Sequence, residues 1–148
     1  MALPTGAGTE TLHSHAFNDV DTTAAQTLIF GLQHHVYTVL SAIFYCNVLN
    51  ATTDYGYIIF IGHDGHAGAS AQEINLARFN IQVGETFVWN DKFCFNGYEV
   101  TGTTAFNAAQ QIAIAAQSGS VAQQLSFAQT STTDDFDVHI TFLDQDWT

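Results

Sequence analysis

Basic side chains are almost absent from this sequence. Its 148 residues include 2 Lys+Arg, which are Arg78 and Lys92, against 14 Asp+Glu, and the formal net charge is −12. A protein that binds phosphates needs basic side chains to neutralise them, and the acidic field of this chain repels polyanions. We therefore expect no binding to nucleic acid and none to a membrane surface.

Charged residues of both signs are scarce, at 11% of the chain, where a typical soluble domain has about a quarter. Neutral polar residues, mainly Thr, Gln, Asn and Ser, take their place. Because lysine is depleted from interface cores, this composition favours burial against neighbouring subunits; an acidic cell-surface or halophilic protein is the alternative. The chain is 47% hydrophobic and 13% aromatic, which predicts one folded domain and not a disordered acidic segment.

Cysteine and proline are rare, with 2 and 1 residues. Cys46 and Cys94 lie in apolar runs without a CxxC spacing, which favours two buried thiols, although a single bridge between them is also compatible. No segment has the composition of a signal peptide or the length of a membrane span. Motifs for a serine nucleophile or a phosphate loop are also missing, so we expect no enzymatic activity and no cofactor.

Alternating apolar and polar residues dominate from about residue 27 onward and predict an all-β fold. In the long run 36–47, a strict period of two places the even-numbered residues on one face and the odd-numbered residues on the other. Other predicted strands are 27–32, 55–61, 74–81, 85–89, 92–95, 98–101 and 136–143, with a hairpin at Asn96-Gly97 and with Phe136, Val138, Ile140 and Phe142 on one face. These strands indicate a single-domain antiparallel β-sandwich or jelly roll.

Two segments depart from this pattern. Residues 1–24 are polar and aperiodic, which predicts an extended N-terminal arm, lying on another subunit, ahead of a sandwich domain at 25–148. Residues 105–135 read as an insertion between strands. Its Ala and Gln content favours a helix by propensity, but apolar residues alternate at 112 and 114 and at 125 and 127, so we prefer a hairpin.

The histidines and clustered aspartates are the candidate metal ligands. His63 and His66 flank Asp64 on a glycine-rich loop, where their spacing fixes no geometry. His13-Ser-His15 with Asp19 resembles the first motif of cupins, but the pair precedes the predicted strands and Pro4 is the only proline, so the second cupin motif is missing. Calcium ligation by Asp134, Asp135 and Asp137 lacks the glycine and glutamate of an EF-hand loop. We expect a solvated acidic turn and no metal site.

Several turns and strand ends together carry a family resemblance. They are the strand end Ile43-Phe-Tyr-Cys-Asn47, the turn Gln82-Val-Gly-Glu-Thr86, the hairpin that ends at Gly97 and the alternating strand 136–143. With these features the chain resembles small β-sandwich virion proteins of tailed bacteriophages, over about residues 27–103 and 136–143. The resemblance implies a non-enzymatic structural protein of the virion, assembled in the host cytoplasm.

The most concrete form of this hypothesis is a capsid decoration (cement) protein, a homotrimer whose partners are the major capsid protein and copies of itself. The alternative is a tail, baseplate or fibre module that binds a host receptor or glycan through Tyr55, Tyr57, Trp89 and the His63–His66 loop. A metal-dependent jelly-roll enzyme is a third class. The subunit contacts we expect are Leu12, His13, His15, Phe17, Phe106, Ile112, Leu125, Phe127 and Trp147.

Overall fold

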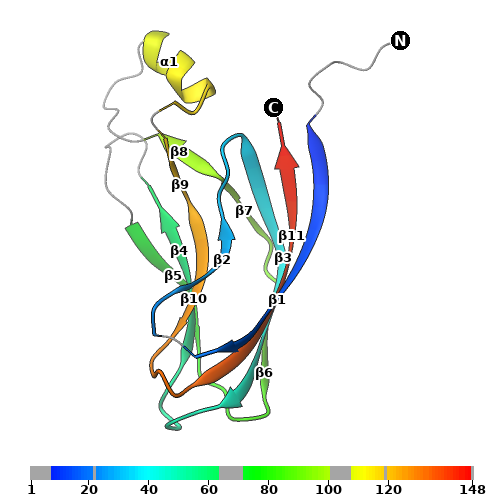
Figure 1. The fold of residues 1–148 in the computed structure, drawn as a ribbon, viewed down its shortest axis with the longest axis vertical. Helices are drawn as coiled ribbons and strands as arrows, with labels where there is room; N and C mark the ends of the chain where they lie inside the picture. Colours follow the sequence, from blue (N-terminus) through cyan, green and yellow to red (C-terminus); the bar gives the residue numbers. More distant parts are fainter. Residues whose placement is uncertain (1–7, 22, 64–71, 101–107, 119, 148) are drawn as a thin grey trace.

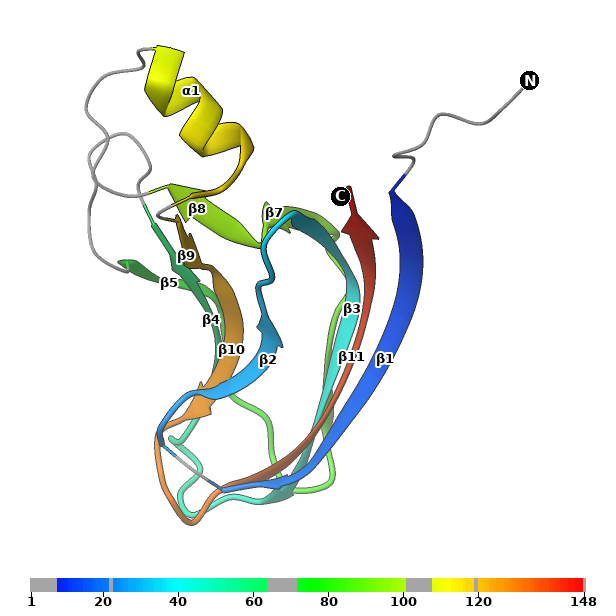
Figure 2. The ribbon, with the colours of Figure 1, turned by 45° about the horizontal axis from the view of Figure 1, so that its top comes forward.

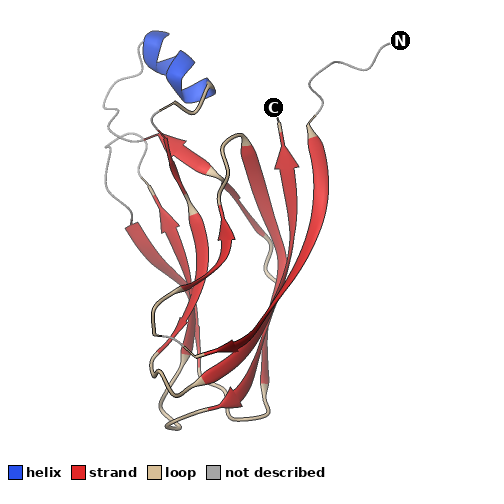
Figure 3. Ribbon diagram, in the orientation of Figure 1, coloured by secondary structure: helices blue, strands red, loops and turns tan. Residues whose placement is uncertain are grey.

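The computed structural model describes residues 8–21, 23–63, 72–100, 108–118 and 120–147. Within these ranges, two antiparallel sheets pack face to face, with a two-stranded ribbon and a short helix beyond one end (Figure 1, Figure 3). The prediction of an all-β antiparallel sandwich is therefore confirmed, while the finer description as a jelly roll stays a prediction. No helix in the described ranges is long and apolar enough to cross a membrane.

The strands divide into two main layers, which diverge toward one end of the molecule (Figure 2). The five-stranded sheet has β1 at one edge, followed by β11, β3 and β6, and β7 also pairs with β3. The four-stranded sheet has the order β2, β10, β4, β5, and β8 pairs with β9. The bounds are β1 Thr9–Val20, β2 Gln26–Phe30, β3 His35–Val48, β4 Gly56–Gly62, β5 Gln72–Phe79, β6 Thr86–Trp89, β7 Phe93–Asn96, β8 Tyr98–Val100, α1 Ala108–Ala115, β9 Ser120–Ala122, β10 Gln124–Gln129 and β11 Asp135–Asp146.

Aromatic rings fill the space between the sheets. Phe44 of β3 lies 5.0 Å from Phe127 of β10, centroid to centroid, and Phe127 lies 5.4 Å from Phe136 of β11. The predicted inward face of β11 is confirmed, because Phe136, Val138, Ile140 and Phe142 are all at most 4% exposed. Burying each such side chain contributes roughly 1.5–3 kcal/mol, so this cluster is the main source of stability.

A β-bulge in β3 breaks the strict alternation expected for residues 36–47. Val39 pairs with Phe142 and Ser41 pairs with Thr141, which leaves Leu40 without an opposite residue. The extra residue exchanges the two faces of the strand. Tyr37 and Val39 are therefore buried on the same side as Phe44, and the predicted faces are wrong for the first half of β3.

The segment expected to be an N-terminal arm is largely an edge strand of the chain's own sandwich. Residues Thr9 to Phe17 pair continuously with β11, from Asp146 to Val138. The sequence looks aperiodic because its inward-facing positions include His13 and His15 in place of aliphatic residues. This part of the chain therefore does not lie apart from the sandwich.

The segment 105–135 is not a single insertion, and the preferred hairpin is wrong for its first half. Residues 108–115 form α1, in agreement with their Ala and Gln propensity. Residues 124–129 form β10, which pairs with both β2 and β4 and is buried from Leu125 to Gln129. This stretch is therefore a central strand of the second sheet.

The expected pair of buried thiols is half right. The structure has no disulfide between the two cysteines: Cys46 is buried and Cys94 is exposed. Cys94 lies opposite Thr38, on the outward side of β7. Only Cys46 therefore contributes to the core.

Gly97 crosses from one sheet to the other, and the hairpin expected at Asn96-Gly97 does not form. β7 pairs with β3, while β8 pairs with β9. The Gly97 amide donates to the His35 carbonyl at 2.7 Å, and the Gly97 carbonyl accepts from the Gln123 amide at 2.8 Å. A Cβ on Gly97 would lie 2.9 Å from the Leu32 nitrogen and closer still to the Leu32 carbonyl oxygen, so only glycine fits here.

Replacing this glycine should therefore strongly destabilise the fold. We expect Gly97→Ala to lower the free energy of unfolding by at least about 2 kcal/mol, because the new methyl group meets backbone atoms. Gly84 is the control, because its φ of 84° also favours glycine but a Cβ added there would have no atom within 4 Å. Gly84→Asn should cost less, about 1 kcal/mol or below, because only the backbone angle is strained there and Asn tolerates this region better than most residues. Urea denaturation measures the free energy of unfolding of both variants. Equal losses of stability in the two variants would contradict the close backbone packing at Gly97.

Candidate functional site

The centre of the outer face of the five-stranded sheet is neutral, and it lies between an outward row that contains Glu10 and an outward row that contains Asp137. The three central rows of side chains across the strands contain no carboxylate, lysine or arginine. Exposed apolar side chains stand among them, including Leu12 at 63%, Val88 at 51% and Ile43 at 37%. The rows are Leu12, Leu143, Thr38 and Cys94; Ser14, Thr141 and Ser41; and Ala16, His139, Ile43 and Val88.

A neutral face is unusual on a chain with a net charge of −12. Proteins of this kind remain monomeric through the mutual repulsion of their charged surfaces. Two copies that met through these three rows would bring no carboxylates together at the centre of the contact, and Glu10 and Asp137 would lie at its margins. The face therefore suits contact with another protein surface better than any acidic part of the chain does.

The same sheet ends in a long edge strand. β1 pairs with β11 on one side, and no described strand pairs with its other side (Figure 2). Natural edge strands are protected by shortness, lysine, proline or bulges. β1 is 12 residues long and has neither lysine nor proline, and its only irregularity lies near its end, between Phe17 and Val20. Its free backbone groups are available to a further strand.

The inner face of β1 contains three of the predicted contact residues. His13 stacks on Phe142 at 5.0 Å, and His15 meets the same ring edge-on at 5.3 Å. Phe17 is partly buried against the core. These side chains therefore hold β1 to its own sandwich, and Leu12 is the one predicted contact on β1 that points outward.

His13 and His15 also line a cleft of about 180 Å³ at the open side of the sandwich, between β1 and β2. The cleft contains Asp144, whose Oδ1 lies 2.7 Å from His35 Nδ1 and whose Oδ2 lies 3.8 Å from His13 Nε2. Burial, helped by the charge of Asp144, raises the pKa of Tyr37 to about 12. The Tyr37 hydroxyl is therefore protonated at neutral pH and accepts a hydrogen bond from the Leu32 amide. It is no nucleophile, and we assign no reaction to the cleft.

The remaining predicted contacts lie in different places. Ile112 on α1 is 71% exposed, and Phe106 lies outside the described residues. Leu125 and Phe127 are 1% and 0% exposed in the core, so no other chain can reach them. The alternation of apolar residues at 125 and 127 therefore indicates a core strand and not a contact surface. Trp147 remains 44% exposed, although its ring meets His34 at 4.7 Å and its amide donates to the His34 carbonyl.

The residues of the alternative, receptor-binding hypothesis are only partly brought together. Tyr55 and Tyr57 lie side by side at the outer face of the four-stranded sheet, with ring centroids 5.8 Å apart. Trp89 belongs to the other sheet, where its indole N–H donates to the Asp91 carbonyl. His63 follows β4. His66 lies outside the described residues, so the structure does not test a metal site that uses both histidines.

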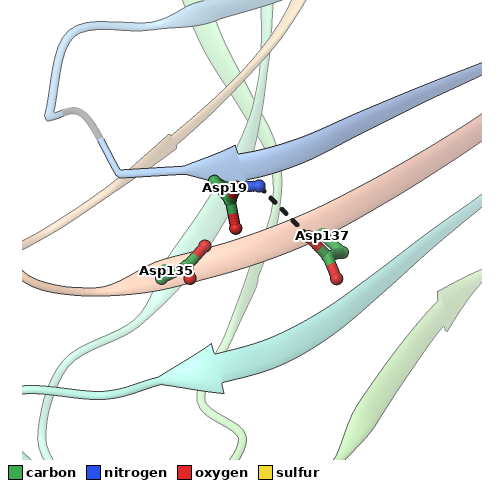
Figure 4. Close-up of side chains that lie close together, drawn as sticks. All are labelled: Asp19, Asp135 and Asp137. Carbon is green, nitrogen blue, oxygen red and sulfur yellow. Dashed lines mark hydrogen bonds between the residues drawn. The ribbon is translucent and has the colours of Figure 1, made fainter.

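Three carboxylates come together where β1 meets the start of β11 (Figure 4). One oxygen each of Asp19, Asp135 and Asp137 lies within 4.8 Å of the others. Asp19 has a φ of 53° in the irregular end of β1, and its amide donates to the Asp137 carboxylate. Sequence reasoning grouped Asp19 with His13 and His15 and not with this cluster, because the bulge, not a motif, brings Asp19 here. Calcium takes six to eight oxygens, so this cluster alone does not define a metal site.

The expected solvated acidic turn is wrong for Asp134. This residue is fully buried, and its carboxylate accepts a hydrogen bond from the Asn50 amide at 2.8 Å. Burial raises the pKa of its carboxyl above the ordinary value. Asp134 therefore has a structural role, in which it holds the turn after β3 against the turn before β11.

Comparisons with family models, curated proteins and solved structures find no match to the chain. The resemblance to virion proteins therefore rests on the sequence features alone.

The acidic cluster predicts a dependence of stability on pH. Burial and the nearby charge of Asp19 raise the pKa of Asp135 above its ordinary value of 3.8. Because the folded state then binds its proton more tightly than the unfolded state, the contribution of this group to stability is lost as pH rises through the folded-state pKa. Asp135→Asn should therefore stabilise the protein at neutral pH, by about 0.5–1 kcal/mol, and the gain should shrink below the ordinary pKa.

Thermal unfolding measured across this pH range tests the expectation. Asp91→Asn is the matched control, because it removes one exposed carboxylate away from the cluster. A loss of stability in Asp135→Asn at neutral pH, with Asp91→Asn unchanged, would contradict a repulsive cluster.

Proposed function

We propose that this protein is a non-enzymatic structural protein that acts by association through the β1 edge and the neutral centre of the outer face of its five-stranded sheet. The observation that carries the proposal is the coincidence of the two surfaces. A strand edge without lysine or proline adjoins an uncharged, partly apolar patch, formed by the three central rows, on a chain that is otherwise acidic. Such an edge and face can bind by strand addition and by burial of apolar area.

The partners follow from the sequence resemblance to small virion proteins of tailed bacteriophages. In the most concrete form, the chain is a capsid decoration protein that binds the major capsid protein and copies of itself as a homotrimer. In a threefold ring, β1 of one copy meets a different surface of the next copy, since such contacts are head-to-tail. Many copies on one shell multiply a modest affinity by avidity. A tail or baseplate module remains the alternative, supported by the adjacent Tyr55 and Tyr57.

A single lysine on the contact surface should weaken the association. Leu12 is 63% exposed in the outward row beside the free edge, and a lysine there both removes apolar contact area and protects the edge. We expect Leu12→Lys to lower the oligomeric mass in light scattering and to weaken occupancy of capsids by about tenfold or more. The fold should be unaffected, because the side chain does not enter the core.

Val83→Lys is the control, since Val83 is 58% exposed in the turn before β6, away from β1. This variant should keep the mass and occupancy of the native chain. A native chain that stays monomeric and does not bind capsids would overturn the proposal, as would equal losses in both variants. A few copies at the tail tip, in place of many on the shell, would favour the receptor-binding alternative.

A further inference from the structure

A polar hollow lies on the outer face of the four-stranded sheet, at its β4–β5 edge. It has a volume of about 330 Å³, which falls in the range of small-molecule sites. It belongs to the sheet opposite the proposed contact surface. Its lining consists of Tyr55, Tyr57, Glu73, Asn75 and Arg78.

A β-bulge in β5 turns Arg78 toward this hollow. Ala77 pairs with Ile58 and Asn75 pairs with Ile59, which leaves Leu76 as an extra residue. Leu76 and Ala77 consequently both pack against the core, and Arg78 points outward on the same side as Asn75. Bulges re-aim side chains in this way and are over-represented next to functional sites.

Arg78 is one of only two fixed cations in a chain with 14 acidic residues, yet it forms no ion pair with another residue that the structure describes. Every ion pair within the described ranges involves a histidine. The Arg78 guanidinium carbon instead lies 3.3 Å from the centroid of the Tyr55 ring. Stacking on the ring fixes the plane of the guanidinium and leaves its N–H edges free to bind a planar carboxylate in a bidentate pair.

The other lining groups complement a sugar. The side chains of Tyr57, Glu73 and Asn75 have no hydrogen bond to another described residue. A carboxylate, a carboxamide and a phenol together accept from and donate to hydroxyl groups, while the Tyr57 ring offers an apolar face to the C–H groups of a pyranose. Because of the bulge, Glu73 and Arg78 face Ile61 and Tyr57, which are four positions apart on β4. This is roughly 13 Å at 3.3 Å per residue, so the hollow is long enough for a sugar ring and its substituents.

We propose that this hollow binds a saccharide that carries a carboxylate, with the carboxylate on Arg78, a sugar ring against Tyr57, and hydroxyl groups on Asn75 and Glu73. The single arginine matches one carboxylate. A polyanion is disfavoured, because the chain has a net charge of −12 and no basic patch. A purely apolar ligand would bury these polar groups without partners. The proposal is independent of the assembly function, since it uses the other sheet.

The probes that test this site are methyl glycosides of glucuronic, galacturonic and N-acetylneuraminic acid, each compared with a neutral glycoside of the same ring. Saturation-transfer NMR and titration of the intact protein give the affinities. We expect at least one acidic glycoside to bind in the millimolar range, which is typical of shallow sites, and to bind more tightly than its neutral counterpart. No binding of any acidic glycoside would overturn the proposal, as would equal affinity for the neutral glycosides.

Two variants distinguish a bidentate pair between Arg78 and the ligand carboxylate from a general effect of net charge on binding. Arg78→Gln should lower the affinity for the acidic glycoside by about tenfold or more. The weaker affinity for the neutral glycoside should not change. Lys92→Gln removes the only other fixed cation, outside the hollow, and should leave both affinities unchanged. Equal losses in the two variants would show a general charge effect and overturn the site. The oligomeric mass of Arg78→Gln should match the native chain, whatever the outcome for Leu12→Lys.

Discussion

The sandwich depends on β11, which pairs along its whole length with β3 on one side and, with one irregularity, from Phe136 to Asp146 with β1 on the other. Its inward residues, from Phe136 to Phe142, close the aromatic core, while His139, Thr141 and Leu143 on its outward side continue the neutral rows. At one end Asp135 and Asp137 meet Asp19, and at the other Asp144 meets His35. A strand in this position has little freedom of register, because a shift by one residue would bring His139 and Thr141 into the core.

The two faces presented to solvent differ because the two sheets bury their aromatic residues in different ways. The five-stranded sheet keeps most of its large rings inside, with Tyr45 as an exposed exception, so the centre of its outer surface is neutral and partly aliphatic. The four-stranded sheet places Tyr55 and Tyr57 outside, and the bulge in β5 adds Arg78 to them. One sheet therefore offers area and a free edge, and the other offers a small set of directed polar groups. Association and ligand binding need these different properties.

The strands with clear alternation were predictable from the sequence, and β11 and β4 are the best examples. Prediction failed where contacts between distant residues decide the outcome. The bulges at Leu40 and Leu76 become visible only when the partner strand is known. β1 was missed because histidines replace aliphatic residues on its inner side. The candidate surfaces were harder still to predict. Tyr55 and Tyr57 were named from the sequence, but Arg78 joins them only through a bulge. Leu125 and Phe127, predicted as contact residues, lie in the core.

The pairing of Thr9 with Asp146 has a consequence for folding. The earliest and latest described strands lie side by side, and β11, the latest, separates β1 from β3 in the sheet order. The five-stranded sheet cannot close until synthesis has passed residue 146, so a nascent chain carries β1 and β3 without the strand that joins them. Contacts of such long sequence separation slow folding and expose strand edges in the meantime. The order of synthesis thus makes the period before β11 leaves the ribosome the time of greatest risk of mispairing between chains.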